Sequence, residues 1–332
     1  MDTVTTGRTP PLTEPRARRP IKRALAAGRW ADSLFKLTTL MFALVVAGLV
    51  VVIIINMAMN ARLSFDKFGF DFITRSIWDP VHEEYGALPF IYGTAMSALI
   101  ALLIAVPLSI GIAIFLSEHA PRRLATPIAF LVQLLAAIPS VVYGLWGIFV
   151  LAPLLRNHVY PAIQKVLGAL PLFQGQINGL GLLTAGIILA IMVVPIVTAV
   201  TTDVMRAVPG AQREAALALG ATRWEATRII LQNARSGIVG AIILGLGRAV
   251  GETMAVTMVI GNRPEISASL FEPSFTIASA IANEFTEATS EMYRHALVEL
   301  GLILFVITFV INAAARLLVY AVTRGQGKVA HA

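Results

Sequence analysis

The chain alternates between long apolar runs and shorter polar connections. A hydrocarbon core of about 30 Å is crossed by roughly 20 apolar residues in a helix. Six runs reach this length, and they predict transmembrane helices at about residues 34–59, 91–116, 124–151, 180–204, 238–260 and 297–322. Prolines fall inside the second, third and fourth runs, where neighbouring helices can satisfy the carbonyls that a proline frees. The pattern predicts an all-α polytopic membrane protein with its membrane domain at residues 34–325.

The first 33 residues differ from the rest because they are polar, basic and rich in proline. Such a segment cannot bury enough apolar surface to offset its ordering entropy, so we expect a disordered tail. The apolar run that follows is longer than the core of a signal peptide and lacks a small-residue cleavage site, which predicts a retained first span. Residues 326–332 are expected to form a short tail at the other end.

The distribution of charge predicts which connections lie inside the cell. Of the 332 residues, 57% are hydrophobic and 14% charged, a composition that no soluble domain of this size has. The net charge of +7 is compatible with nucleic-acid binding, but 18 of the 26 Lys and Arg residues fall on one side of the six-span arrangement. Two of the opposite connections, 60–89 and 261–296, are acidic. This partition follows the positive-inside rule, places both termini and the 206–235 loop in the cytoplasm, and argues against a nucleic-acid partner.

Catalytic and metal chemistry find little support in the sequence. The chain has no cysteine, and its five histidines are scattered without metal-ligand spacing. An intramembrane enzyme would need a Ser–His pair, paired intramembrane aspartates or metal ligands, and none is present. A secondary transporter would need an internal repeat and coupling-ion carboxylates, but Glu252 is the only acid that lies away from the ends of the spans. We therefore expect no catalytic residues and no metal site.

The longest inner loop reads VPGAQREAALALGATRWEATRIILQNARSG, residues 208–237. Its pattern predicts two short helices separated by a bend at Gly220, forming an exposed knob on the cytoplasmic surface. An alternative interpretation is an amphipathic helix on the lipid surface, which Arg213, Arg223 and Arg228 would suit.

This loop resembles the EAA loop of bacterial ABC importer permeases. The residues that match are Glu214, Ala215, Ala216, Gly220 and the run at 229–231. In that family the loop docks into a groove on the cytoplasmic ATPase and transmits its closure to the membrane helices. The sequence departs from the pattern in two ways: isoleucine arrives one residue early, and Gln232 replaces the usual proline.

The resemblance extends over most of the chain from about residue 90. IPSVVYGLWG (138–147), GRAVGETMAV (247–256) and FTIASAIANEF (275–285) are similar to the PstC-type family of permease subunits in phosphate-specific ABC importers. It implies a type I permease fold in the bacterial inner membrane and phosphate as substrate. Its implied partners are a second related permease in a heterodimer, two ATPase subunits and an extracytoplasmic phosphate-binding protein. A sulfate or molybdate importer is the alternative.

The sequence also indicates where ATP would bind. No GxxxxGK[ST] motif is present, so this chain has no P-loop to cradle ATP. We expect no cofactor in this chain, with ATP and magnesium bound by the separate ATPase.

Arg248 and Glu252 are the only charged residues between positions 238 and 260. Arg248 lies about ten residues, or roughly 15 Å, into its span, where an arginine costs at least about 2.5 kcal/mol and must face protein or water. The four-residue spacing lets the two side chains pair, and nearby glycines leave room for another helix or a ligand. A guanidinium suits a tetrahedral oxyanion. We therefore predict a place on the phosphate pathway, with Glu252 tempering the positive charge.

Other interpretations stay open at these positions. The ion pair can instead fix helix register at a subunit interface without meeting substrate. Ser140 and Tyr143 are weaker pathway candidates, because a proline kink used only for packing explains them equally well. Asn283 and Glu284, in the outer acidic loop, either contact the binding protein or form a solvated loop end.

Overall fold

The computed structural model describes residues 21–324, and the regular elements in this part of the chain are helices. Six of them, 26 to 32 residues long, are apolar enough to cross a membrane. This confirms the prediction of an all-α polytopic membrane protein. The chain divides into two units, residues 1–56 and 57–332.

The described part of the first unit belongs to a single helix, α1 (Ile21–Asn60). Residues 21–33, predicted to be disordered, are helical here. The reason is local: alanine, leucine, lysine and arginine dominate this stretch, and all four favour the helix. Most of the predicted N-terminal tail and the predicted tail at 326–332 lie outside the described residues.

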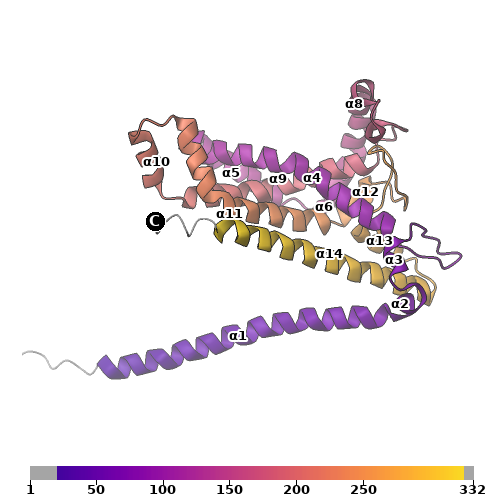
Figure 1. Cartoon of the computed structure of the whole chain (residues 1–332), viewed down its shortest axis with the longest axis horizontal. Coiled ribbons are helices and arrows are strands. Elements are labelled where there is room, and N and C mark those ends of the chain that lie inside the picture. Colours follow the sequence, from indigo (N-terminus) through magenta and orange to yellow (C-terminus); the bar gives the residue numbers. More distant parts are fainter. Residues whose placement is uncertain (1–20, 325–332) are drawn as a thin grey trace, which may run out of the picture. The chain divides into compact units, whose positions relative to one another are not determined.

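The second unit contains the other five candidate spans (Figure 1). Its first half contains α2 (Arg62–Phe68), α3 (Asp71–Thr74), α4 (Leu88–Ile114) with a π turn (Phe115–His119), α5 (Arg122–Ala136), α6 (Ser140–Trp146), α7 (Ala152–Leu154) and α8 (Tyr160–Leu167). Its second half contains α9 (Leu182–Ala207), α10 (Gly210–Ala218), α11 (Arg223–Val250), α12 (Met254–Val259), α13 (Ile277–Glu284) and α14 (Glu291–Arg324).

The third predicted span, residues 124–151, is not one helix. Pro139 lacks the amide hydrogen that a continuous helix needs and disfavours helical backbone in the residue before it, so α5 ends at Ala136 and α6 begins at Ser140. The candidate span is instead 140–167. Two π turns, at 147–151 and 155–159, precede Pro153 and Pro161 along this span.

Helices α4, α9 and α11 form the centre of the second unit. The core is built around buried aliphatic residues of α9, and glycines bring the helices close together. A Cβ on Gly186 would lie 2.5 Å from Ile100 of α4, and one on Gly237 would lie 2.4 Å from Val204 of α9. Small residues at such positions are what allow membrane helices to pack by van der Waals contact.

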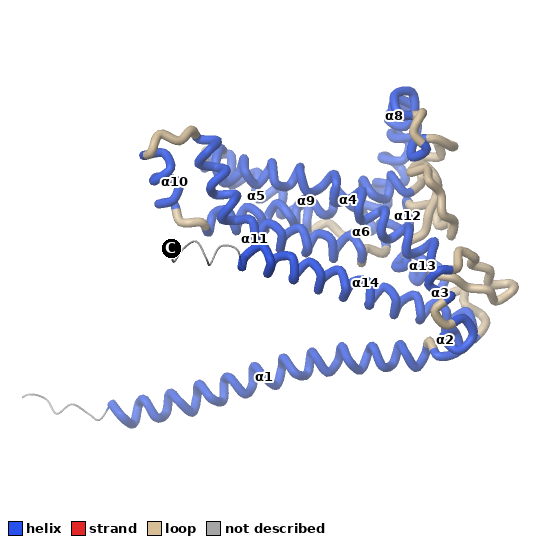
Figure 2. Tube along the Cα trace, viewed as in Figure 1, coloured by secondary structure: helices blue, strands red, loops and turns tan. Residues whose placement is uncertain are grey.

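The two ends of the second unit carry different loops. Helix α10 and the start of α11 lie at one end, and α3, α8 and α13 lie at the opposite end (Figure 1). The longer loops gather at that opposite end (Figure 2). The basic 206–235 loop and the acidic connections are therefore on opposite ends, as the charge pattern requires.

Glu284 is not part of a solvated loop end. Its carboxylate accepts hydrogen bonds from the indole Nε1 of Trp78 and the hydroxyl of Tyr293, each at 2.8 Å. Burial raises the pKa of Glu284. The side chain fastens the outer segment to α14 and is partly buried, whereas Asn283 is exposed.

Gly93 and Gly111, both on α4, provide a matched test of this packing. A Cβ on Gly93 would lie 2.2 Å from the carbonyl oxygen of Phe275, while one on Gly111 has no neighbour within 4 Å. Gly93→Ala should lower the free energy of unfolding by about 1–3 kcal/mol because backbone must move. Gly111→Ala should leave it unchanged or raise it. Thermal unfolding of the detergent-purified protein measures both, and equal effects would contradict the assigned contact.

Candidate functional site

The fifth predicted span, residues 238–260, is interrupted in the middle of the apolar run. Helix α11 starts earlier than predicted, at Arg223, and ends at Val250, and α12 starts at Met254. Gly251 closes α11 by donating its amide to the carbonyl of Gly247 at 3.2 Å. The break leaves backbone groups without partners of their own helix, which is costly inside a membrane.

Arg248 and Glu252 lie on the two sides of this break and pair across it. The guanidinium Nη2 lies 3.1 Å from the carboxylate Oε2. The other carboxylate oxygen accepts a 3.4 Å hydrogen bond from the amide of Ala255, in the first turn of α12. The Glu252 side chain is 4% exposed, whereas that of Arg248 is 45% exposed. The predicted pair therefore forms, with the acid buried and the base open.

The charges match the helix ends they occupy. A cation is stabilised near a helix C-terminus and an anion near an N-terminus, because the unpaired carbonyls and amides there carry partial charge. Arg248 lies in the last turn of α11, and Glu252 precedes the first turn of α12. The two charged side chains thus stabilise the helix ends at the break as well as each other.

Arg248 lies on an exposed stripe of α11. The stripe contains Gly240, Leu244, Gly247, Arg248 and Gly251. A Cβ on Gly240 or Gly247 would meet open space, whereas Gly245, on another face, packs against Val193 and Val197 of α9. Gly240 and Gly247 therefore leave room along the face that carries Arg248, whereas Gly245 allows close packing within the chain.

The helix that carries Ser140 and Tyr143 packs against α12. A Cβ on Gly144 of α6 would lie 3.2 Å from the Cα of Ala255, so the two backbones approach closely. Tyr143 is buried, and its hydroxyl donates to the carbonyl of Leu135 at 2.8 Å, close to where Pro139 breaks the helix. That bond gives Tyr143 a structural role at the end of α5. Ser140 starts α6 and is partly exposed.

The 206–235 loop has the predicted bend, but its second helix is not short. Gly220 has a φ of +87°, and the amides of Gly220 and Ala221 close α10 by bonding to Leu217 and Ala216, as in a Schellman motif. Thr222 and Glu225 then form a capping box that starts α11. From there α11 continues without interruption to Val250, because Gln232, unlike a proline, keeps its amide donor.

The matched residues of this loop differ in exposure. Glu214 and Ala215 are exposed on α10, whereas Ala216 is buried. Leu219 is 89% exposed and Trp224 63% exposed, so the bend presents apolar surface outward. Such a knob is suited to a protein partner.

One ionic contact of this region was not predicted from the sequence. Glu118, at the end of α4, pairs with Arg213 of α10, 95 residues later. No local spacing could indicate a pair so distant in the sequence.

Six candidate spans, an interrupted helix with a buried ion pair and an exposed helical knob fit the transmembrane subunit of an ABC transporter. The chain belongs to the family of binding-protein-dependent transport system inner membrane components, whose family model matches residues 105–326.

Relatives and a solved structure agree with this assignment. The phosphate transport system permease protein PstC of Haemophilus influenzae is 49% identical over 90% of this chain and 96% of the relative. That of Mesorhizobium japonicum is 49% identical over 89% and 92%. An inward-facing structure of the MetNI methionine ABC transporter has the same fold, with a TM-score of 0.50 and 16% identity over 71% of this chain and 94% of that one.

The asymmetric burial of the ion pair predicts asymmetric mutational costs. Arg248→Gln leaves a buried carboxylate unpaired and should lower the free energy of unfolding by up to about 3 kcal/mol. Glu252→Gln leaves a half-exposed guanidinium that water can reach, so its cost should be smaller, and the double variant should recover part of the loss. Thermal unfolding of purified protein ranks the three. If Glu252→Gln is the most damaging, the burial assignment is wrong.

Proposed function

We propose that this chain is a transmembrane permease of an ATP-driven phosphate importer and forms half of its translocation pathway. The observation that carries the proposal is the half-exposed Arg248 held by a buried carboxylate at a helix break. The names of the relatives, at 47–49% identity over about nine-tenths of the chain, support phosphate as the substrate.

The exposure of Arg248 supports a pathway beside α11. An arginine at this depth must face protein or water, since lipid would leave its charge unsolvated. The glycine-rich stripe around it admits a second helix or a ligand. A second, related permease in a heterodimer would supply the opposite wall, and water and substrate would pass between the two subunits.

The chemistry of the pair suits an oxyanion that must pass through and leave. The guanidinium offers planar donors to phosphate oxygens, and Glu252 partly neutralises it. With both carboxylate oxygens directed at donors of the chain, Glu252 also fixes the arginine in place. The names of the relatives favour phosphate over sulfate or molybdate.

The energy source and the outer partner follow from the same fold. Two ATPase subunits, binding ATP and magnesium, would serve the two permeases, and one would dock on the knob around Gly220. An extracytoplasmic phosphate-binding protein would deliver substrate at the opposite end. In this arrangement the protein spans the bacterial inner membrane with both termini in the cytoplasm and carries no cofactor or catalytic residue itself.

The pathway role predicts that charge order matters. Arg248→Gln combined with Glu252→Gln, a neutral pair of similar shape, should lower phosphate uptake by about tenfold or more, because bonds to a charged group are lost. The exchange Arg248→Glu with Glu252→Arg should also fail, with the complex assembled. Uptake and complex yield are measured together in cells.

The matched control is Arg263→Gln with Glu265→Gln, which removes an exposed 2.8 Å ion pair of the outer loop and should leave uptake unchanged. Recovery of wild-type uptake by the charge exchange would instead assign the pair to helix register. Faster uptake of sulfate or molybdate than of phosphate by the wild-type complex would assign the substrate to the alternative.

Docking of the ATPase predicts that the bend at Gly220 is indispensable. A Cβ at Gly220 would meet open space within the chain, but the φ of +87° strains any residue other than glycine. A bulky side chain at the bend would also prevent the loop from entering the proposed groove on the ATPase. Gly220→Trp should therefore insert normally yet lose phosphate uptake. Gly210→Trp, equally open but without a positive φ, is the comparison. Normal uptake together with normal co-purification of the ATPase in Gly220→Trp would refute docking at this bend.

A further inference from the structure

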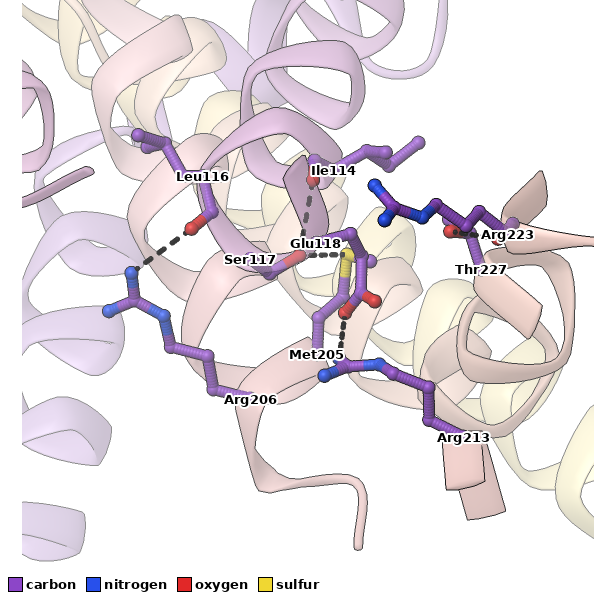
Figure 3. A network of polar contacts seen from close by, with 9 residues as sticks. All are labelled: Ile114, Leu116, Ser117, Glu118, Met205, Arg206, Arg213, Arg223 and Thr227. Carbon is purple, nitrogen blue, oxygen red and sulfur yellow. Dashed lines mark hydrogen bonds and ion pairs between the residues drawn. The ribbon is translucent and has the colours of Figure 1, made fainter. Parts of the chain in front are cut away.

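The cytoplasmic end of α4 holds a buried carboxylate that the proposed pathway does not use. Glu118 lies in the π turn 115–119, and its side chain is only 5% exposed. Its Oε1 accepts a short hydrogen bond from Nη2 of Arg213, and Figure 3 shows the two side chains pointing toward each other. A buried carboxylate is stable only when paired, so this contact fixes where α10 lies against α4.

The same π turn is held from a second side by α9. Arg206 donates to the carbonyl of Leu116 at 3.3 Å, and the Ser117 hydroxyl lies 3.7 Å from the sulfur of Met205 (Figure 3). Met205 itself is buried with Ala113 of α4 and Ile230 of α11. The π turn thus receives contacts both from α9, which precedes the docking loop, and from α10, which lies within it.

The contact of α10 with this turn depends on one ion pair over a small cavity. A cavity of about 120 Å³ lies beneath α10, and its walls include Glu118, Arg213, Leu217 and Thr227. Packing there is incomplete, so apolar contact alone does not hold α10 against α4. The ion pair is therefore a direct contact through which α10 and the end of α4 can move together.

We propose that Glu118 is a positioning residue for energy coupling: its pair with Arg213 transmits movement of the ATPase-docking loop to α4 and so to the pathway. The inference rests on the proposed function. Breaking the pair leaves the docking knob and the Arg248 site intact but disconnects α4 from the knob. The complex then hydrolyses ATP without moving phosphate.

The test uses the whole importer, with both permeases, the ATPase subunits and the binding protein, in proteoliposomes. The measured quantity is ATP hydrolysed per phosphate imported. Glu118→Gln, a neutral side chain of the same size, and Arg213→Gln should each raise this ratio about fivefold or more, the lower end of typical coupling between sites. Arg213→Lys keeps the charge and should stay near the wild-type ratio. Arg123→Gln, which removes an exposed charge from the same connection, is the matched control.

A second measurement separates coupling from folding. Because the chain has no cysteine, Glu118→Cys with Arg213→Cys can be bridged by a reducible bifunctional thiol reagent. Bridging should restore the low ratio and reduction should raise it again, in the same folded sample.

The inference is overturned if Glu118→Gln leaves the ratio of ATP hydrolysed to phosphate imported unchanged. It is also overturned if the bridged pair stays uncoupled. Neither outcome affects the proposed function, because the wild-type complex still imports phosphate. Absence of phosphate import by the wild-type complex refutes the proposed function instead. If Glu118→Gln does not assemble, the Arg213→Lys variant and the bridged pair decide the question.

Discussion

A helix that ends inside a membrane must satisfy its own backbone, and at the break at 251–253 the Glu252 carboxylate accepts the amide of Ala255 while it pairs with Arg248. Arg248 lies by the carbonyl end of α11 and Glu252 by the amide end of α12, so each charge is stabilised by the helix it adjoins. The break in turn sets the direction of α12, and α12 is the helix on which Gly144 of α6 rests. The geometry of the proposed pathway wall follows from this one ionic contact.

The second break in the membrane region obeys the same rule with neutral groups. Between α5 and α6, Tyr143 reaches back to the Leu135 carbonyl and the amides of Ala137 and Ile138 close the end of α5. The Tyr143 hydroxyl is enough to hold this break, because α6 is also packed closely against α12. The two interruptions lie on helices in direct contact, so they support each other.

Hydropathy was enough to predict the number of spans, because about 20 apolar residues have few other fates in a chain this apolar. It misplaced the third span, which covers residues 140–167 and not 124–151. The interruptions were harder, since a proline such as Pro139 permits either a kink or a full break, and packing decides between them. Gly220 was predictable as a bend because its left-handed backbone favours glycine. The four-residue spacing predicted that Arg248 pairs with Glu252. It did not predict that the Glu252 side chain is buried while that of Arg248 is half exposed. Glu118 and Arg213 meet only through tertiary packing, so their contact left no trace in the sequence.

The uninterrupted course of α11 has a mechanical consequence. Its 28 residues make a rod of about 42 Å, with the capping box at one end and Arg248 near the other. For a stiff rod of that length, pivoting at one end by about 5° sweeps the other end through roughly 3.5 Å. A salt bridge of 3.1 Å does not survive a displacement of that size unless its partner follows. A small rotation at the proposed ATPase-docking end would therefore be amplified into a displacement at Arg248 larger than the length of its ionic contact.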